Sequence, residues 1–363
     1  MKHICFFSGD ITRDGGTERV ATAVANGLAR MGKYKVSFLS LVQQRETPFY
    51  PIEPGIPCAA LTQSGKWVRP GPGYLPFLPK LRRFLKTRQV DVAVDIDIVL
   101  DALTLPAAAG LGVRVISWEH FAFQFEQSVP YRRMISRLTA RFADDIVTLT
   151  AHDRGNYQET LHRKNRIVTI ENPVRFPAET SAKREKLILT VGRLEYGKGT
   201  DLLAGVIPEV LRRCEGWRWC FLGEGEGRGA LEAVRREHGL GDRLLLPGVV
   251  QDVEGWLLRS SLMVMASRSE GLSMCLLEAR AYQVPCIAFD VPVAPGELIR
   301  HGGNGFLVPP FDTVCMAGRI VQLAQDDALR GRFSDAAAEG MEPYRLDAVL
   351  GKWVRLLEAA GEP

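Results

Sequence analysis

Short apolar runs alternate with longer segments in which apolar positions recur at helical spacing, and this alternation covers almost the whole chain. In the first half, strands are expected at residues 3–8, 35–41, 90–95, 114–118, 145–149 and 167–171, with helices between them, for example at 17–31, 130–142 and 151–161. A polar stretch at 174–185 indicates a linker. The alternation then resumes, with strands expected at 186–191, 217–222, 243–246, 262–266, 286–289 and 305–308.

Repeated strand-then-helix order predicts an α/β protein, because successive parallel strands need a crossover helix between them. The chain has 363 residues, which fits two domains better than one. We therefore expect two Rossmann-like parallel-sheet domains in tandem, at residues 1–174 and 185–344, facing each other across a cleft and followed by a C-terminal helix within 345–363. Ligands of such sheets bind beyond the carboxyl ends of the strands, so residues there are the candidates for function.

The composition predicts a globular protein of the cytoplasm. Hydrophobic residues make up 46% of the chain and charged residues 24%, as in soluble domains. No apolar run approaches the roughly 20 residues that span a bilayer, and no export signal is expected. The seven cysteines form no C-x-x-C pair, which argues against a disulfide framework or a zinc site and fits a reducing compartment.

Positive charge is concentrated in the first half of the chain. Residues 1–172 hold 23 Lys and Arg against 16 Asp and Glu, whereas the remainder holds 23 against 26. From Lys66 to Arg88 there are seven cations and no acidic residue, interleaved with Trp67, Tyr74, Phe77 and Phe84. A solvated helix face explains this pattern, and so does contact with an anionic membrane or a diphosphate-bearing acceptor. Nucleic acid is a weaker alternative, because no recognition motif accompanies the charge.

Two glutamates eight residues apart, Glu270 and Glu278, flank a glycine turn and an expected helix start. Ser273 is expected to be the N-cap of a helix that carries Glu278 about a turn and a half in. Backbone N–H groups of residues 272–275 would then point toward a diphosphate, and a carboxylate within the helix suits the two hydroxyls of a ribose. Taken alone, such a pair is more often a solvated loop residue and an exposed helix residue. Other clusters favour the functional interpretation.

The first strand is followed by a loop that contains Gly15 and Gly16 and opens a helix. Their backbone could approach a phosphate closely, or the loop could simply be flexible. Glu119 and His120 close the strand at 114–118. This histidine is either a structural residue or a functional one that the neighbouring carboxylate could tune.

The first strand of the second half leads into Arg193 and Lys198. Two cations there would stabilise a diphosphate leaving group, whose negative charge grows as a sugar departs, although a pair of surface charges is the simpler alternative. Gly223 and Val250 follow two further expected strands. All these loops are expected at the carboxyl edge of the second sheet.

Several motifs occur in a fixed order along the chain: Gly192-Arg193 with Lys198, then Gly223-x-Gly225, then Ser267-x-x-Glu270-Gly271, then Glu278-Ala279, after an N-terminal glycine loop and a Glu119-His120 pair. In this order they resemble glycosyltransferase family 4, a family of retaining enzymes, and the resemblance is densest over residues 186–308. It implies a GT-B fold in which the second domain binds the nucleotide-sugar, the first binds the acceptor, and the last helix crosses back to the first domain.

The resemblance also implies roles for individual residues. Glu270 and His120 would contact the transferred sugar and are the catalytic candidates, whereas Glu278 would bind the ribose. The complete set of expected nucleotide-sugar contacts is Gly15, Gly16, Arg193, Lys198, Gly223, Val250, Gly271, Leu272, Ser273, Met274, Cys275 and Glu278.

The chain departs from the family pattern near the sugar. Ser273-Met274 stands where Gly or Pro is often found, and the residue after His120 is not polar as in some branches, so the donor sugar stays open. Asp95-Ile96-Asp97 imitates the metal motif of a different transferase fold, but we interpret it as structural or acceptor-facing because it falls in the first domain. No metal or other cofactor is expected.

We expect a retaining transferase that moves a hexose (galactose, N-acetylgalactosamine or glucose) from a UDP-sugar to a glycan acceptor. A lipid-linked intermediate of bacterial surface polysaccharide assembly is the favoured acceptor. The alternatives are a nonhydrolysing UDP-sugar epimerase of GT-B fold, a glycoside hydrolase, and a catalytically silent nucleotide-sugar-binding subunit. The expected location is the cytoplasm, with a peripheral position on the inner face of the cell membrane if the basic segment contacts lipid.

Overall fold

The computed structural model describes residues 1–63, 68, 71–161, 166–178, 184–292 and 294–359. Lys66, Trp67 and Arg69 of the basic segment therefore lie outside the described residues. The chain divides into two compact units, the first made of Met1–Pro173 with Pro343–Pro363 and the second of Val174–Glu342. None of the helices among the described residues combines the length and apolar character needed to span a bilayer.

The first unit is built on a seven-stranded sheet in the order β3-β2-β1-β4-β5-β6-β7, with every neighbouring pair parallel. Its strands are β1 (Lys2–Ser8), β2 (Tyr34–Val42), β3 (Cys58–Thr62), β4 (Val92–Ile96), β5 (Arg114–Trp118), β6 (Asp145–Thr148) and β7 (Arg166–Thr169). The six expected strands are present. The edge strand β3 was not expected, because its sequence C-A-A-L-T is short and contains two alanines, which are poor strand formers.

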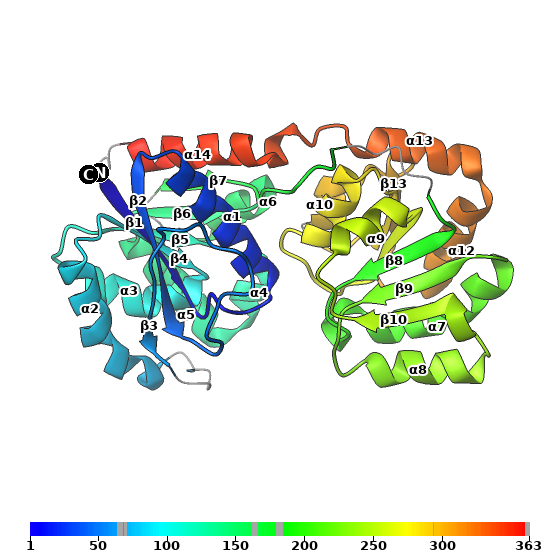
Figure 1. Cartoon of the computed structure of the whole chain (residues 1–363), viewed down its shortest axis with the longest axis horizontal. Helices are drawn as coiled ribbons and strands as arrows, with labels where there is room; N and C mark the ends of the chain where they lie inside the picture. Colours follow the sequence, from blue (N-terminus) through cyan, green and yellow to red (C-terminus); the bar gives the residue numbers. More distant parts are fainter. Residues whose placement is uncertain (64–67, 69–70, 162–165, 179–183, 293, 360–363) are drawn as a thin grey trace. The chain divides into compact units, whose positions relative to one another are not determined.

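Helices lie on both faces of this sheet, as Figure 1 shows. They are α1 (Gly16–Arg30), α2 (Leu78–Thr87), α3 (Asp101–Ala108), α4 (Phe123–Ser128), α5 (Pro130–Phe142), α6 (Ala151–Thr160) and α14 (Leu346–Glu358), with 3-10 turns η1 (Pro72–Phe77) and η2 (Ile98–Leu100). A further 3-10 turn, η5 (Glu342–Tyr344), begins at the last residue of the second unit and precedes α14.

The last helix, α14, belongs to the first unit and runs beside α1 (Figure 1). Its Trp353 is fully buried, with its ring centroid 4.8 Å from that of Trp118 and 6.3 Å from that of Phe6. Lys352 forms an ion pair with Glu171. The expected return of the last helix to the first domain is confirmed, and an aromatic cluster accounts for it.

The second unit is built on a six-stranded sheet in the order β10-β9-β8-β11-β12-β13, again with every neighbouring pair parallel. Its strands are β8 (Leu187–Val191), β9 (Arg218–Leu222), β10 (Leu244–Gly248), β11 (Leu262–Met265), β12 (Cys286–Phe289) and β13 (Gly305–Val308). Its helices are α7 (Thr200–Arg213), α8 (Arg228–Glu237), α9 (Val253–Arg259), α10 (Met274–Ala281), α11 (Ala294–Leu298), α12 (Thr313–Gln325) and α13 (Asp327–Ala337), with 3-10 turns η3 (Tyr196–Lys198) and η4 (Gly241–Arg243).

Both units have the expected α/β architecture. The strands of the second sheet are almost continuously apolar, because helices cover both faces of a parallel sheet. The core of this unit includes Trp219 and Phe221, whose rings stack at 5.7 Å. The fold-class prediction of two parallel-sheet domains is therefore confirmed.

The described aromatic residues of the basic segment pack toward the core of the first unit. Tyr74 is buried, and Phe77 and Phe84 pack against the core of the first unit. Arg82 donates hydrogen bonds to the carbonyl oxygens of Ala107 and Ala109, at 2.9 and 2.7 Å. The aromatic residues described in this segment therefore support the core, and one of its cations ties α2 to the end of α3.

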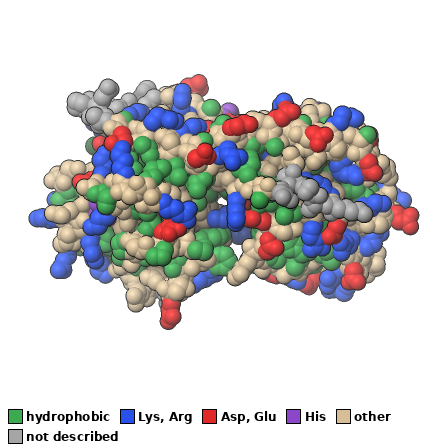
Figure 2. Space-filling model, turned by 45° about the horizontal axis from the view of Figure 1, so that its top comes forward, with side chains coloured by type: hydrophobic (Ala, Val, Ile, Leu, Met, Phe, Trp, Pro, Cys, Tyr) green, Lys and Arg blue, Asp and Glu red, His purple; other side chains and the backbone are tan. Residues whose placement is uncertain are grey.

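Charged side chains of both signs lie close together on the face shown in Figure 2, with apolar side chains between them. The net charge of +4 is therefore not carried by one uniformly basic face in this view. The charges on this face would therefore not steer an anionic ligand toward one particular area.

Candidate functional site

The strand order of the second sheet reverses between β8 and β11. From β8 the chain proceeds outward through β9 to β10, whereas from β11 it proceeds the opposite way through β12 to β13. In open parallel sheets such a switch point leaves a crevice at the carboxyl ends of the strands, where ligands bind. The loop after β8 carries Arg193 and Lys198, and the loop after β11 carries Glu270, so the predicted residues flank the switch point.

Lys198 and Glu270 meet across this switch point. The Lys198 Nζ donates to Glu270 Oε1 at 2.7 Å, although the two residues are 72 positions apart in sequence. Burial disfavours the charged lysine, but the charge and hydrogen bond of Glu270 outweigh burial and raise the pKa of Lys198. The structure therefore holds a protonated ammonium group at the place where a ligand of this sheet is expected.

Two glycines allow the loops to approach one another closely. Gly199 has a φ of 70°, and a Cβ there would lie 2.0 Å from the carbonyl oxygen of Ala266. Gly223 has a φ of 143°, and a Cβ there would lie 2.0 Å from the carbonyl oxygen of Gly192. Any side chain at either position would force backbone apart, so the glycines bring the loops after β8, β9 and β11 together.

Arg268 fastens the loop after β11 to the turn η3. Its guanidinium binds both carboxylate oxygens of Asp201, at 2.8 and 2.7 Å, and lies 3.6 Å from the ring centroid of Tyr196. Its backbone N–H also donates to the carbonyl of Gly197 at 2.9 Å. Arg268 was assigned no role from the sequence. The signal that could have found it is its position inside the Ser267-x-x-Glu270 motif, two residues before Glu270. Arg268 holds Lys198 and Glu270 in register.

The helix α10 begins beside this pair, as expected, with Ser273 at its N-cap position. Ser273 is thus the N-cap residue as predicted, but its side-chain hydroxyl makes no capping hydrogen bond. That hydroxyl instead donates to the sulfur of Met265 at 3.2 Å and lies 3.1 Å from the sulfur of Cys275. The N–H groups of the first turn of a helix have no partner within it, so those of α10 are left without this side-chain acceptor.

Other residues predicted to bind the nucleotide-sugar lie at the same edge of the sheet. Arg193 is 75% exposed and forms an ion pair with Glu195 at 2.9 Å. Glu278 is half-buried in the second turn of α10. Gly271 and Leu272 belong to the loop before that helix, Met274 is its first residue, and Val250 follows β10 at the edge of the sheet. Lys198 and Glu270 are two predicted residues that the structure joins by an ion pair.

In the first unit, Gly15 is the N-cap residue of α1 and Gly16 is its first helical residue. The carboxylate of Glu18 turns back against this turn, so a Cβ at Gly15 would lie 2.2 Å from Glu18 Oε2. Burial raises the pKa of Glu18, which favours its neutral form beside the start of the helix. The contact of Gly15 and Gly16 with a phosphate stays a prediction.

His120 follows β5 and packs against Trp118 in a tilted arrangement, with 4.6 Å between the ring centroids. Glu119 does not bind the imidazole, which corrects the expectation that this carboxylate tunes it. Its Oε1 instead accepts hydrogen bonds from the backbone N–H groups of His120 and Phe121, at 2.8 and 2.9 Å. Burial, and not Glu119, lowers the pKa of His120 to about 3. The imidazole is therefore neutral at physiological pH and can give or accept a hydrogen bond.

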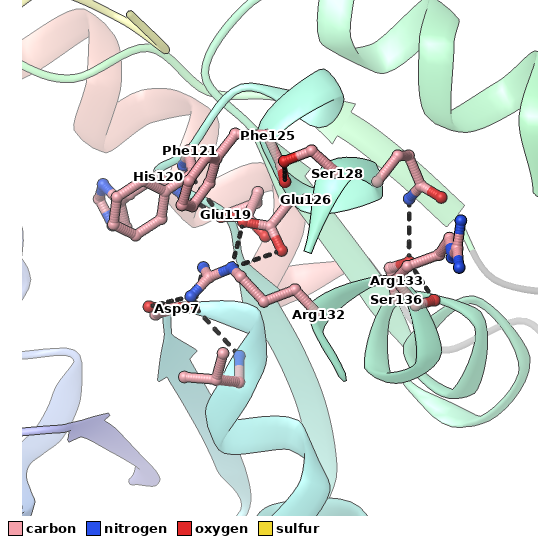
Figure 3. A network of polar contacts seen from close by, with 12 residues as sticks. Asp97, Glu119, His120, Phe121, Phe125, Glu126, Ser128, Arg132, Arg133 and Ser136 are labelled. Carbon is pink, nitrogen blue, oxygen red and sulfur yellow. Dashed lines mark hydrogen bonds and ion pairs between the residues drawn. The ribbon is translucent and has the colours of Figure 1, made fainter. Parts of the chain in front are cut away.

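A buried ion network supports the His120 loop (Figure 3). Arg132 of α5 donates to both carboxylate oxygens of Glu126, at 2.8 and 2.9 Å, and to Asp97 at 2.7 Å. Asp95 accepts from the Thr104 hydroxyl at 2.8 Å. Both aspartates of the Asp95-Ile96-Asp97 triplet are thus bound by protein side chains, as the structural interpretation has it. The expected absence of a metal stays a prediction.

Replacing His120 by Asn should flatten the acid side of the stability profile. Because the folded pKa is depressed to about 3 from 6.5, His120 contributes stability above pH 6.5 that is lost as the pH falls. Its share of the slope is at most about 1.4 kcal/mol per pH unit. Urea unfolding of wild type and His120→Asn from neutral to acid pH measures it. His238→Asn, at an exposed position after α8, is the control, and parallel wild-type and His120→Asn profiles would contradict the assignment.

These observations define a class of protein: two parallel α/β units, of which the second carries a lysine–glutamate pair at its switch point beside a helix start. Comparison with known proteins agrees. The family model "Glycosyltransferase Family 4" matches residues 14–176, and "Glycosyl transferases group 1" matches residues 185–326. A Haemophilus influenzae protein described as an uncharacterized glycosyltransferase is 30% identical over 359 residues, 98% of this chain and 100% of that protein. The chain belongs to glycosyltransferase family 4 and is a glycosyltransferase of GT-B fold.

Two other similar proteins differ more in sequence. A Campylobacter jejuni protein is 22% identical over 351 residues, 94% of this chain and 95% of its own. Its name describes an α-1,4-N-acetyl-D-galactosaminyltransferase acting on a GalNAc-GalNAc-diNAcBac-PP-undecaprenol acceptor. The crystal structure of Anabaena HepE in complex with UDP and glucose is 16% identical, with a TM-score of 0.80 over 98% of this chain and 99% of that one. The likeness to HepE shows the fold.

Proposed function

We propose that this protein is a retaining glycosyltransferase that moves a hexose from a UDP-sugar to a glycan acceptor, with a lipid-linked intermediate of surface polysaccharide assembly as the acceptor. The observation that carries the proposal is the Lys198–Glu270 pair at the switch point of the second sheet, 2.7 Å apart beside the start of α10. A cation next to unpaired helix N–H groups suits a diphosphate, and a carboxylate beside it suits the hydroxyls of a sugar.

In this proposal Lys198 and the first turn of α10 bind the diphosphate. Arg193 would add a second cation, which requires its exposed side chain to leave Glu195 when the donor arrives. Diphosphate binding would also draw Lys198 away from Glu270 and leave that carboxylate free to accept from a sugar hydroxyl. Glu278, half-buried one turn further along α10, would accept from the ribose hydroxyls.

The reaction breaks the bond between the anomeric carbon and the diphosphate oxygen and forms a bond from that carbon to the acceptor oxygen. With retention, the acceptor hydroxyl attacks from the face that UDP leaves, and a diphosphate oxygen takes its proton. Lys198 stabilises the growing charge on the leaving group, and Glu270 orients the donor and stabilises positive charge on the sugar. His120, as a neutral imidazole, would position the transferred sugar by hydrogen bonding without exchanging a proton.

The named relatives support the donor and acceptor classes. HepE was solved with UDP and glucose, and the Campylobacter jejuni relative is named for an acceptor linked to undecaprenol through a diphosphate. That relative transfers N-acetylgalactosamine, which is among the hexoses we propose. The departure at Ser273-Met274 keeps galactose, N-acetylgalactosamine and glucose all open.

Mass spectrometry of products tests the proposal against its rivals. The protein is incubated with a panel of UDP- and GDP-sugars and a lipid-diphosphate glycan acceptor. We expect one UDP-sugar to add a hexose mass to the acceptor and to release UDP. A changed sugar without acceptor elongation would instead identify an epimerase, shortening of a glycan would identify a hydrolase, and donor binding with no product would identify a silent subunit.

Separate substitutions of Glu278 and Glu270 should affect UDP binding and turnover differently. Glu278→Gln should mainly weaken UDP binding, since it alone is placed on the ribose, whereas Glu270→Gln should lower turnover with less effect on UDP affinity. Calorimetric titration with UDP and steady-state kinetics measure the two effects. Glu237→Gln, at an exposed position of α8, is the matched control. Loss of UDP binding in Glu270→Gln alone would reverse the two assignments.

A further inference from the structure

Many of the exposed apolar side chains of the first unit belong to α4, α5 and the residues just before them. Of the fourteen exposed large apolar side chains among the described residues, six lie between positions 121 and 142: Phe121, Phe125, Tyr131, Met134, Leu138 and Phe142. The last four follow α5 at spacings of three and four residues and so form one ridge along the helix. Met134 is 58% exposed and Phe142 60% exposed. We call this the α4–α5 surface.

A row of cations accompanies the apolar ridge. Arg133, Arg137 and Arg141 are exposed and repeat every four residues, each one position before an apolar residue of the ridge. The helix α5 contains no Asp or Glu, and among the described residues no ion pair engages these three arginines. The outer face of α5 therefore combines a continuous apolar ridge with unneutralised positive charge.

The inner face of α5 is fixed, so this outer face is not an accident of loose packing. Ile135 and Ala140 enter the core, and Arg132 is buried in its network with Glu126 and Asp97. Figure 3 shows Phe121 and Phe125 beside the Arg132 guanidinium, which lies 4.7 and 5.5 Å from their ring centroids. The buried arginine thus holds both rings next to α5 with their outer sides exposed.

We propose that the α4–α5 surface docks on an anionic phospholipid bilayer. An amphipathic helix with a basic row beside an apolar ridge lies in the interface plane of a membrane, its apolar side chains at the acyl boundary and its cations at the headgroups. A second copy fits less well, because a two-fold contact of this surface with itself would bring the arginine rows together without carboxylates. Nucleic acid would neutralise the arginines and leave the ridge exposed to water.

This proposal goes beyond the proposed function and places the membrane contact on a different surface from the basic segment. The basic segment over residues 66–88 was the candidate, but its described aromatic residues face the core and Arg82 binds the end of α3. On the α4–α5 surface, by contrast, both the apolar side chains and the arginines are exposed. It also follows β5 and His120 directly in the chain, so docking would bring the acceptor-binding unit to the layer that contains lipid-linked glycans.

Flotation with vesicles of phosphatidylcholine and phosphatidylglycerol, compared with phosphatidylcholine alone, tests the docking at low and moderate salt. We expect the wild-type protein to float with the anionic vesicles. Replacing Arg133, Arg137 and Arg141 together by Gln should weaken that binding by roughly 100-fold, since each cation near the surface adds a similar increment. Replacing Met134, Leu138 and Phe142 together by Ser should weaken binding at both salt concentrations.

Matched controls lie elsewhere on the chain. Arg83→Gln with Lys86→Gln removes two exposed cations of α2, and Val314→Ser removes an exposed apolar side chain of α12; both should float like wild type. Circular dichroism and UDP titration should be unchanged in every variant. Docking is overturned if wild type does not float, if the α5 variants float normally, or if only the α2 variant is impaired.

Sedimentation of the free protein distinguishes the remaining occupant of this surface. A concentration-dependent dimer that both α5 variants abolish would assign the surface to a second copy and overturn the proposal. A failure of flotation leaves UDP binding and sugar transfer intact, whereas a failure of the transferase reading appears in the product analysis. The two proposals can therefore fail separately.

Discussion

Replacing Lys198 by Ala is expected to lower turnover by about 100-fold, the usual loss when one contact to transition-state charge is removed. The ammonium group is partly buried and held 2.7 Å from Glu270 at the switch point. The effect should appear in kcat more than in folding, because the pair lies in a loop region at the edge of the sheet. Steady-state kinetics with saturating donor measures it.

Lys186→Ala is the matched control, since Lys186 is exposed and lies just before β8, whereas Lys198 follows that strand. It should retain normal turnover. The double variant Lys198→Ala with Glu270→Gln should lose less activity than the two single losses multiplied, because the two side chains contact each other. Wild-type turnover in Lys198→Ala would remove that residue from the site.

Replacing Trp353 by Ala is expected to cost about 3–5 kcal/mol of unfolding free energy, as for other fully buried tryptophans. The side chain is 0% exposed and contacts the rings of both Trp118 and Phe6. Because Trp118 in turn packs against His120, the cavity should also loosen the histidine and lower turnover in the molecules that stay folded. Denaturant unfolding followed by tryptophan fluorescence, with activity measured on the same samples, tests both effects.

The control for this change is Arg355→Ala, two residues further along α14 on its exposed face. It should shift stability by no more than about 0.5 kcal/mol, as is usual for surface substitutions. If Trp353→Ala were no more destabilising than this control, α14 would not be a structural part of the first unit. A Trp353→Phe variant should recover much of the lost stability, because a large ring refills most of the cavity.

The strands were predictable because parallel strands covered on both faces are nearly continuous apolar runs. The sequence of β12, C-I-A-F, is an example, and its predicted and observed limits coincide. The strand β3 lacked this signal, because only one edge of it is paired and none of its residues is fully buried. β3 forms by pairing with β2, and the local sequence pattern does not indicate that pairing.

For the candidate site, the motifs identified the loops but not the partners of their side chains. Lys198 and Glu270 were both predicted as ligand-binding residues, yet their ion pair joins residues far apart in sequence and follows only from the strand order. The same holds for Arg268 with Asp201. Glu119 was expected to tune the imidazole of His120. Its carboxylate instead accepts hydrogen bonds from the two backbone N–H groups that follow it in the same turn.

The return of α14 to the first unit has a consequence for how the protein is made on the ribosome. The core around Phe6 and Trp118 lacks Trp353 until the whole of Val174–Glu342 has been synthesised. At 5–20 residues per second, those roughly 170 residues take on the order of 10–30 seconds. The nascent first unit must spend that time with an open apolar face, so the second unit can finish folding before the one that precedes it. Chaperones that recognise apolar surface should therefore act on the early chain and be released when α14 emerges.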